Sequence, residues 1–231
     1  MRPVAGRAVA PEFDAAGLRR RLDAGLADMA LDLDQDARGR LIRYVALLAR
    51  WNRAYNLTAV RDPAEMVPRH ILDSLTVLPH LEGRRCLDVG SGAGLPGLVL
   101  ALAQPATDWV LLDSNAKKCR FLTRAKAELA IDNVRVVRSR VEDFHPQARF
   151  STIISRALSN LAEFVAAAVH LLAPGGRLLA MKGRDPDHEL PALGGLGVQA
   201  EVVPLSVPGI EDVRRHLVIV TAAGASGPAR A

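Results

Sequence analysis

A glycine-rich turn between an apolar run and a helix-like segment constrains the fold of this 231-residue chain most strongly. Residues 87–97 read LDVGSGAGLPG, so a short apolar run ends in a carboxylate, breaks into glycines and then continues as a helix. An α/β sheet presents its first strand-to-helix turn to a cofactor in this order. The glycines allow the backbone to approach such a ligand closely.

The chain that follows alternates between short apolar runs and helix-like segments. The runs predict strands at 86–89, 109–112, 134–137, 151–155 and 176–181, with helices at about 95–103, 115–130 and 159–172. This alternation predicts an α/β fold with a mostly parallel sheet and helices on both faces. Two last runs, at 201–205 and 216–221, predict a C-terminal antiparallel hairpin, and a helix plus loop is expected over 186–198.

Helical periodicity dominates the part of the chain before this sheet. Apolar residues recur at helical spacing in segments 14–31, 34–55 and 62–78, and Pro63 suits a first helical position. We therefore expect a helical N-terminal extension. The predicted division is a disordered N-terminus at 1–13, the extension at 14–83, an α/β domain at 84–221 and a disordered tail at 222–231.

Composition narrows the class of protein. A net charge of +5 and a pI of about 9.7 favour a nucleic-acid partner. An alternative stays open, because all basic residues except Lys117, Lys118, Lys126 and Lys182 are arginine, a bias that a GC-rich genome alone can produce. No apolar run is long enough for a membrane helix or signal peptide. Cys86 and Cys119 make neither a disulfide framework nor a metal site, which favours a cytoplasmic protein without a metal.

The glycine-rich turn admits two cofactors. Residues 92–97 fit G-x-G-x-x-G, and Asp113 follows about twenty residues later at the end of an apolar run. Both features belong to the dinucleotide fingerprint, so an NAD-dependent oxidoreductase remains an alternative.

Four features favour S-adenosylmethionine, with S-adenosylhomocysteine as the product. Asp88 precedes the glycines, where a carboxylate suits the ammonium and sulfonium end of that donor better than a pyrophosphate. Asp113 can accept the ribose hydroxyls, a role that both cofactors share. The Val141-Glu142 pair follows the third strand and can sit beside an adenine. Residues 174–176, PGG, form a turn that is frequent in methyltransferase folds.

Two segments outside the turn resemble one known family. Residues 51–58, WNRAYNLT, and 69–74, RHILDS, are similar to the bacterial glucose-inhibited division protein B family. The similarity continues through the turn, LLDS at 111–114, SRVE at 139–142, SRA at 155–157 and KG at 182–183, and spans about residues 40–185. The resemblance implies a Rossmann-like class I methyltransferase that modifies guanine N7 in 16S ribosomal RNA, either naked or in the small subunit.

The resemblance also implies donor contacts. These residues are Gly90, Leu95, Val141, Glu142 and Arg156, and the predicted cofactor site adds Asp88, Gly92, Gly94 and Asp113. Guanine N7 has a free lone pair and no proton to lose, so no general base is expected.

Other polar residues are predicted to position the substrate or to have a structural role. Substrate positioning is assigned to Asn56, Thr58, Arg156 and Lys182. His70 and Asp73, three residues apart on a predicted helix, are expected to be hydrogen-bonded structural groups near the donor pocket rather than a catalytic or metal pair.

The sequence does not single out the RNA-contacting cations, because phosphate contacts need charge rather than spacing. The candidates are Arg38, Arg40, Arg43, Arg50, Arg53, Arg61, Arg69, Lys117, Lys118, Arg120 and Arg124. A non-enzymatic RNA-binding module with a vestigial pocket is the second alternative. A monomer is expected.

Overall fold

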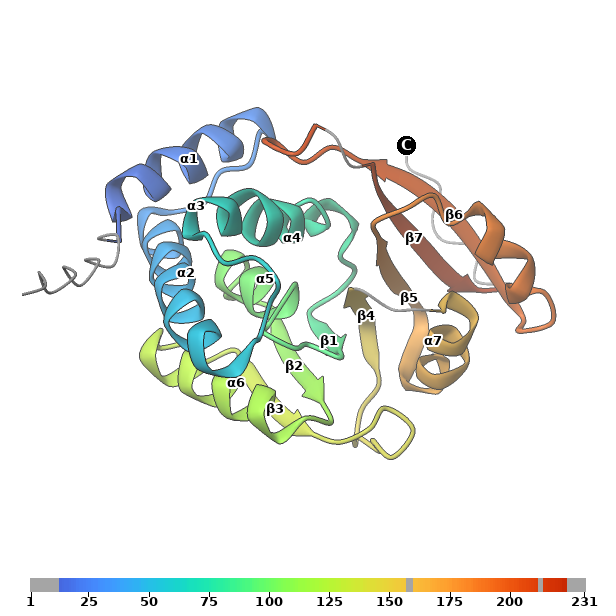
Figure 1. Ribbon diagram of the computed structural model, residues 1–231. Helices are drawn as coiled ribbons and strands as arrows, with labels where there is room; N and C mark the ends of the chain where they lie inside the picture. Colours follow the sequence, from blue (N-terminus) through green and yellow to red (C-terminus); the bar gives the residue numbers. More distant parts are fainter. Residues whose placement is uncertain (1–12, 157–159, 212–213, 224–231) are drawn as a thin grey trace, which may run out of the picture.

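A seven-stranded sheet with strand order β3-β2-β1-β4-β5-β7-β6 organises the molecule (Figure 1). The computed structural model describes residues 13–156, 160–211 and 214–223. β1 to β5 are parallel, and β7 pairs antiparallel with both β5 and β6, as the sequence predicts. The strands are β1 Arg85–Val89, β2 Asp108–Asp113, β3 Val134–Arg138, β4 Phe150–Arg156, β5 Leu172–Lys182, β6 Val198–Leu205 and β7 Arg215–Ala222.

The helices begin at side-chain caps in several places. Asp34 accepts a hydrogen bond from the Ala37 N–H and Asn115 from the Lys117 N–H, so each satisfies a backbone donor that the first turn leaves free. The α-helices are α1 Ala15–Asp28, α2 Gln35–Tyr55, α3 Pro63–Met66, α4 Asp73–Leu75, α5 Gly97–Ala103, α6 Ala116–Glu128 and α7 Leu161–Ala168. A π-helix, η1 Val67–Leu72, and three 3-10 segments, η2 Leu78–His80, η3 Val169–Leu171 and η4 Asp187–Leu193, complete the set in the described residues.

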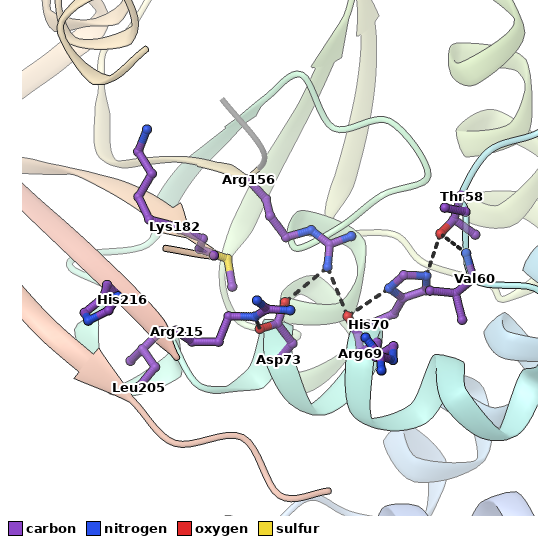
Figure 2. A pocket seen from close by; sticks show the side chains of 13 residues that line it. Thr58, Val60, Arg69, His70, Asp73, Arg156, Lys182, Leu205, Arg215 and His216 are labelled. Atoms are coloured by element: carbon purple, nitrogen blue, oxygen red, sulfur yellow. Dashed lines mark hydrogen bonds and ion pairs between the residues drawn. The ribbon is translucent and has the colours of Figure 1, made fainter. Parts of the chain in front are cut away.

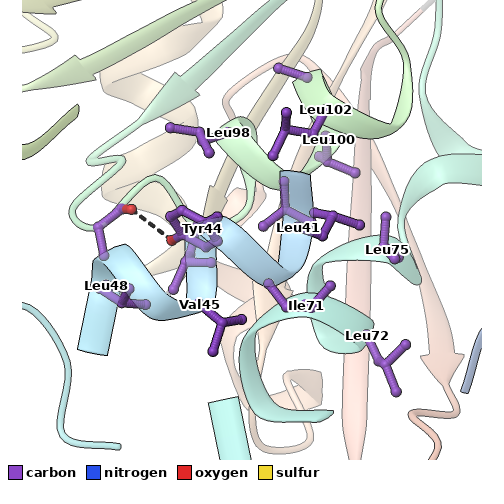
Figure 3. Close-up of a cluster of buried hydrophobic side chains, with 14 of the residues drawn as sticks. Leu41, Tyr44, Val45, Leu48, Ile71, Leu72, Leu75, Leu98, Leu100 and Leu102 are labelled. Carbon is purple, nitrogen blue, oxygen red and sulfur yellow. Dashed lines mark hydrogen bonds between the residues drawn. The ribbon is translucent and has the colours of Figure 1, made fainter. Parts of the chain in front are cut away.

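Each face of the sheet buries its own hydrophobic cluster, because successive strand residues point to opposite faces. On β2, Trp109 and Leu111 join the cluster beneath α1 to α6, whereas Val110 and Leu112 join the cluster beneath α7. Figure 3 shows α2 and α5 meeting in the first cluster, which also holds residues of η1 and α4. The helices before residue 83 therefore share one core with the sheet, and a domain boundary at that residue stays a prediction.

A buried tyrosine ties the N-terminal helices to the glycine-rich turn. The Tyr44 hydroxyl on α2 donates a hydrogen bond of 2.8 Å to the carbonyl of Ala93 (Figure 3). The side chain is fully buried, and burial raises the pKa of its hydroxyl. The hydroxyl therefore stays protonated and holds the turn against α2.

The predicted continuous helix over 62–78 is wrong. The segment passes from α3 into the π-helix η1 before α4, and the Asp73 N–H donates to the carbonyls of both Pro68 and His70. Pro68 lacks an N–H and its ring crowds the preceding turn, which favours a locally widened helix. This widened turn carries His70 and leads into Asp73, two residues of the site described below.

Other differences concern the ends of elements. The α7 helix ends at Ala168 rather than at 172, and β5 begins at Leu172, so the PGG sequence lies within the strand. Ala222 belongs to β7 rather than to a tail. The segment 186–198 forms the short η4 followed by irregular chain. The disorder predicted for residues 1–12 and 224–231 falls outside the described residues. Among the described residues, no helix is both long and apolar enough to cross a membrane.

Candidate functional site

The glycine-rich turn lies at the carboxyl end of β1, beside the point where strand order reverses between β1 and β4. Open α/β sheets bind ligands at such a switch point. Gly90, Gly92 and Gly94 have φ angles of 71°, 58° and 92°, which L side chains rarely adopt. A Cβ at Gly90 would meet no described atom within 4 Å, whereas one at Gly94 would lie 2.8 Å from the Leu98 Cβ. Open space therefore faces Gly90, and close packing surrounds Gly94.

Asp113, at the end of β2, faces the same turn. Its Oδ2 accepts a hydrogen bond of 2.9 Å from the Gly92 N–H, and its Oδ1 accepts one of 2.8 Å from the Asn115 N–H. The Lys118 ammonium lies 3.8 Å from Oδ2. Each carboxylate oxygen has a second lone pair, so Asp113 can accept further hydrogen bonds from a ligand's hydroxyls.

Asp88 is the penultimate residue of β1 and lies under the turn, with no exposed surface. Its Oδ2 accepts a hydrogen bond of 2.9 Å from the Gly97 N–H, while Oδ1 has no partner among the described residues. Burial raises the pKa of this carboxyl to about 7. A buried acceptor without a partner is costly, so its presence beside a ligand-binding turn fits a polar or cationic ligand above it.

Close packing around Asp88 explains the last glycine of the turn. A Cβ at Gly97 would lie 2.6 Å from the Asp88 Oδ2 and 2.5 Å from the Leu111 Cδ2. Only glycine lets the first turn of α5 approach β1 and β2 this closely.

The remaining predicted donor contacts lie within the turn or after β3. Leu95 is buried in the cluster beneath the N-terminal helices. Val141 and Glu142 lie after β3, where Val141 packs partly buried against the second cluster and Glu142 is exposed. They stand at the carboxyl end of the strand next to β2, on the side of the turn where Asp113 lies.

A second group of residues lines a cavity of about 360 Å³ at the carboxyl ends of β4 and β5 (Figure 2). Arg156 ends β4, Met181 and Lys182 end β5, and Arg215 and His216 begin β7. Segments of the N-terminal helices close the other side. We call this space the arginine pocket, and its residues are Thr58, Ala59, Val60, Arg69, His70, Asp73, Arg156, Met181, Lys182, Gly183, Leu205, Arg215 and His216.

Asp73 holds two arginines in this pocket. Its Oδ2 lies 3.2 Å from the Arg156 Nη1, and its Oδ1 lies 3.1 Å from the Arg215 Nε. The side chain of Asp73 is 4% exposed, and those of Arg156 and Arg215 are 22% and 21% exposed. One buried carboxylate thus separates and orients two guanidinium groups that come from distant strands.

His70 fixes the loop that follows α2. Its Nε2 lies 2.8 Å from the Thr58 Oγ1, and its Nδ1 lies 2.9 Å from the Arg69 carbonyl oxygen, which also accepts a hydrogen bond from Arg156. Burial, followed by the charge of Arg156, lowers the pKa of the imidazole to about 4. In the neutral ring, Nδ1–H donates to the Arg69 carbonyl and Nε2 accepts from the Thr58 hydroxyl. No group of residues in the described chain has the composition of a metal site.

Two predicted positioning residues take different places. Asn56 ends α2 with a left-handed φ of 49°, and its Oδ1 accepts a hydrogen bond from Arg61 rather than lining the arginine pocket. Lys182 lines the pocket, but its side chain extends away from Asp73 in Figure 2, toward Glu189 at 2.8 Å. Burial alone would raise the pKa of Glu189, but hydrogen bonds from Lys182 and the Leu161 N–H leave it lowered.

Sequence reasoning missed Arg215 and identified only one of the pocket's other arginines, Arg156, as a site residue. The predicted hairpin gave no signal for Arg215, because the sequence does not show which strand of the sheet 216–221 would pair with. The observed register pairs Lys182 with His216.

Several of the predicted RNA contacts make ion pairs elsewhere. Arg38 pairs with Asp23 and Asp32, and Arg50 and Arg124 share Glu128. Of the candidates, Arg69 alone lines the arginine pocket, within the part of the chain that the structure describes. The other candidates stay predictions.

The sequence matches known proteins over most of its length. Residues 38–218 match the model of the GidB family, described as rRNA small subunit methyltransferase G. A ribosomal RNA small subunit methyltransferase G from Methylobacillus flagellatus is 49% identical over 89% of this chain and 98% of that protein. One from Nitrosococcus oceani is 52% identical over 85% of this chain and 92% of that protein.

Solved structures share the fold at low identity. The glycopeptide N-methyltransferase MtfA, complexed with S-adenosylmethionine, has a TM-score of 0.59 at 13% identity and covers 67% of this chain and 88% of its own. A SAM-dependent methyltransferase from Aquifex aeolicus has a TM-score of 0.55 at 18% identity, over 71% of this chain and 96% of its own. The predicted methyltransferase-like fold is thereby confirmed.

Proposed function

The chain belongs to the GidB family of rRNA small subunit methyltransferase G, and on this premise we propose that it transfers a methyl group from S-adenosylmethionine to N7 of a guanine in 16S ribosomal RNA. The observation that carries the proposal is the adjacency of two half-sites on one sheet edge. The glycine-rich turn with Asp113 lies at the carboxyl ends of β1 and β2, and the arginine pocket lies at those of β4 and β5.

The residues of the turn fit the donor. Asp113 would accept the ribose hydroxyls through its free lone pairs, and Val141 and Glu142 would lie beside the adenine. The open space at Gly90 allows close contact with the methionine part, above the buried Asp88. Arg156 links the two halves, because it ends β4 next to β1 and also lines the arginine pocket. A dinucleotide pyrophosphate fits this turn less well, because it gains nothing from the buried carboxyl group of Asp88.

The chemistry needs positioning rather than proton transfer. The bound donor supplies an electrophilic methyl group, so the S–CH₃ bond breaks as the N7–CH₃ bond forms, and the sulfonium becomes a neutral thioether. Guanine N7 offers a lone pair and loses no proton, so the charge moves to the guanine ring. The protein's residues therefore hold base and donor in line and exclude water, which contributes about 7–11 kcal/mol in favourable cases.

The protonation state of His70 agrees with a reaction that needs no proton transfer. Its pKa of about 4 and its hydrogen bonds at both ring nitrogens leave it neither a general base nor a free donor at neutral pH. We assign it the task of holding Thr58 at the rim of the pocket.

The partner in this proposal is 16S RNA or the small ribosomal subunit, bound by a monomer in the cytoplasm. The cationic pocket provides the electrostatic contact for RNA, and Thr58, Arg156 and Lys182 lie where the target nucleotide would enter. Asn56, at the end of α2, does not line the pocket, so it remains only a predicted positioning residue.

The test uses small subunits from a strain that lacks the protein. They are incubated with the purified chain and methyl-labelled S-adenosylmethionine, and the RNA is digested to nucleosides. Label in 7-methylguanosine is expected. The absence of label, or label in another nucleoside, contradicts the proposal. A rise in melting temperature with NADH but not with S-adenosylmethionine would support the oxidoreductase instead.

A further inference from the structure

We propose that Asp73 is a positioning residue that aims Arg156 and Arg215 at a phosphate of the target nucleotide; this inference rests on the proposed function. Asp73 touches both guanidinium groups, one with each carboxylate oxygen, at 3.2 Å and 3.1 Å. The two arginines lie on β4 and β7, which are separated by β5 in the sheet. No local sequence feature brings them together, so the carboxylate sets their spacing.

The geometry leaves donors free to face the cavity. Arg215 uses its Nε toward Asp73, which directs its two Nη groups elsewhere in the pocket. A Cβ at Gly183 would lie 3.2 Å from the Arg215 Nη1, so glycine leaves room for this guanidinium. The Arg156 Nη1 donates hydrogen bonds to both Asp73 and the Arg69 carbonyl oxygen. A guanidinium held in one orientation presents a fork that matches two oxygens of a phosphate.

The charges of the pocket favour an anion. Asp73 neutralises one of the two guanidinium charges, His70 is neutral because its pKa is about 4, and Lys182 is paired with Glu189. Arg69 is paired with Glu65 at the rim. Together, Asp73, Arg156 and Arg215 therefore present one net positive charge to the cavity. Without Asp73, two like charges would repel and lose their common orientation.

The backbone supports the same role. Asp73 follows the π-helix η1, and its own N–H donates to the carbonyls of Pro68 and His70. Short π-helical turns often occur at functional sites, where they redirect a side chain. Here the widened turn places a carboxylate that is almost fully buried at the sheet edge, where it contacts the arginines of β4 and β7.

The experiment compares Asp73→Asn with Asp23→Asn. Asp23 is a matched control, because its Oδ1 also contacts two arginines, Arg19 and Arg38, at 3.0 Å and 3.1 Å, but in a half-buried cluster of the N-terminal helices that is no part of the arginine pocket. For each variant, kcat and KM are measured with small subunits, donor affinity by calorimetry, and RNA affinity over a range of salt concentrations.

Asp73→Asn is expected to lower kcat/KM for RNA about 100-fold, since misplacement of positioning groups by about 1 Å has this effect. It should also make the slope of log affinity against log salt shallower by about one unit, because one phosphate contact is lost. Asp23→Asn should change neither quantity. A merely structural role for Asp73 would leave the salt slope unchanged, and that result, or wild-type kcat/KM in a folded Asp73→Asn, overturns the inference.

Arg215→Gln keeps the inference testable if Asp73→Asn does not fold. This variant leaves Asp73 paired with Arg156, and the same reduction of the salt slope is expected; an unchanged slope overturns the inference. In the double variant, Asp73→Asn should cause a smaller loss of kcat/KM than it causes alone, because only its effect through Arg156 remains once Arg215 is replaced; fully additive losses also overturn the inference. A wild-type protein that binds RNA with this salt slope but transfers no methyl group refutes the proposed function alone.

Discussion

The glycine-rich turn and the arginine pocket share one sheet edge but are built in opposite ways. The turn takes almost all its groups from residues 88–97 and holds a buried carboxylate, Asp88, with one unpartnered oxygen. The pocket collects its groups from six separated parts of the chain, and both oxygens of its buried carboxylate, Asp73, contact an arginine. The turn, built from one short stretch of chain, thus has a buried carboxylate with one oxygen unpartnered, whereas both oxygens of the carboxylate in the arginine pocket contact cations.

The largest expected effect tests whether the close packing at Gly97 stabilises the glycine-rich turn. Gly97→Ala should destabilise the protein by about 3 kcal/mol, because the added methyl group would lie 2.6 Å from the Asp88 Oδ2 and 2.5 Å from Leu111. Chemical denaturation measures the change. Gly39→Ala is the control, because a Cβ there meets nothing within 4 Å in helix α2, and it should stabilise by about 0.5–1 kcal/mol. Equal stability of the wild type and Gly97→Ala would contradict this account of the turn.

The next effect separates donor binding from packing. Asp113→Ala should weaken S-adenosylmethionine binding about 100-fold, because it removes a charged acceptor and frees the N–H groups of Gly92 and Asn115. Isothermal calorimetry measures the dissociation constant. Asp108→Ala, at the exposed opposite end of β2, is the matched control and should bind the donor normally. Unchanged affinity in Asp113→Ala would show that the donor does not use the end of this strand.

A smaller effect concerns the stability contributed by the buried carboxyl group of Asp88. Burial raises the pKa of Asp88 to about 7, so this group stabilises the fold in its protonated form below its unfolded pKa and loses that contribution as the pH rises through 7. Asp88→Asn keeps the neutral shape, and at pH 8 it should be about 2 kcal/mol more stable than the wild type while binding the donor less tightly.

The pH dependence provides the check on that prediction. The stability difference between Asp88→Asn and the wild type should shrink as the pH falls from 8 toward 4. Asp108→Asn, exposed on the neighbouring strand, should follow the wild type throughout. A destabilised Asp88→Asn at pH 8 would mean that the carboxylate is satisfied in its charged form.

The last effect is absent at neutral pH, develops only in acid and concerns the imidazole of the arginine pocket. In the folded protein the pKa of His70 is about 4, below its usual value near 6.5. As the pH falls, the imidazole therefore becomes protonated in the unfolded state before it does in the folded state. Between pH 6.5 and 4 the wild type should therefore lose about 1 kcal/mol per pH unit more than His70→Gln. Thermal denaturation at several pH values measures this difference, with the exposed His188→Gln as the control. Parallel curves for the wild type and His70→Gln would contradict a buried, neutral His70.

The same contrast explains how far the sequence could predict the molecule. The strands and the hairpin were predictable because the apolar runs alternate with helical patterns, and the contact between Asp113 and the glycine-rich turn follows from neighbouring parallel strands. The interruption of the helix at Val67–Leu72 was not predicted, since its apolar positions fit a regular helix and the effect of Pro68 depends on how the turn packs.

The arginine pocket was the least predictable part. The pairing of Asp73 with Arg215 depends on the register of β5 with β7 and on the packing of η1 against the sheet, neither of which a local pattern contains. The direction of Lys182 likewise depends on Glu189, a residue of the 3-10 segment η4. Thr58 was predicted as a positioning residue, and the resemblance to a known family indicated Arg156 as a site residue, but nothing in the sequence gave a reason to consider Arg215.

Calorimetric titration of S-adenosylmethionine into Asp113→Ala and Arg215→Gln tests most directly whether the two regions are separate halves of one site. The account predicts that Asp113→Ala loses donor affinity while Arg215→Gln keeps it within about threefold, although both fail to methylate small subunits efficiently. Equal loss of donor affinity in both variants would contradict it, because the arginine pocket would then belong to the donor rather than to the RNA.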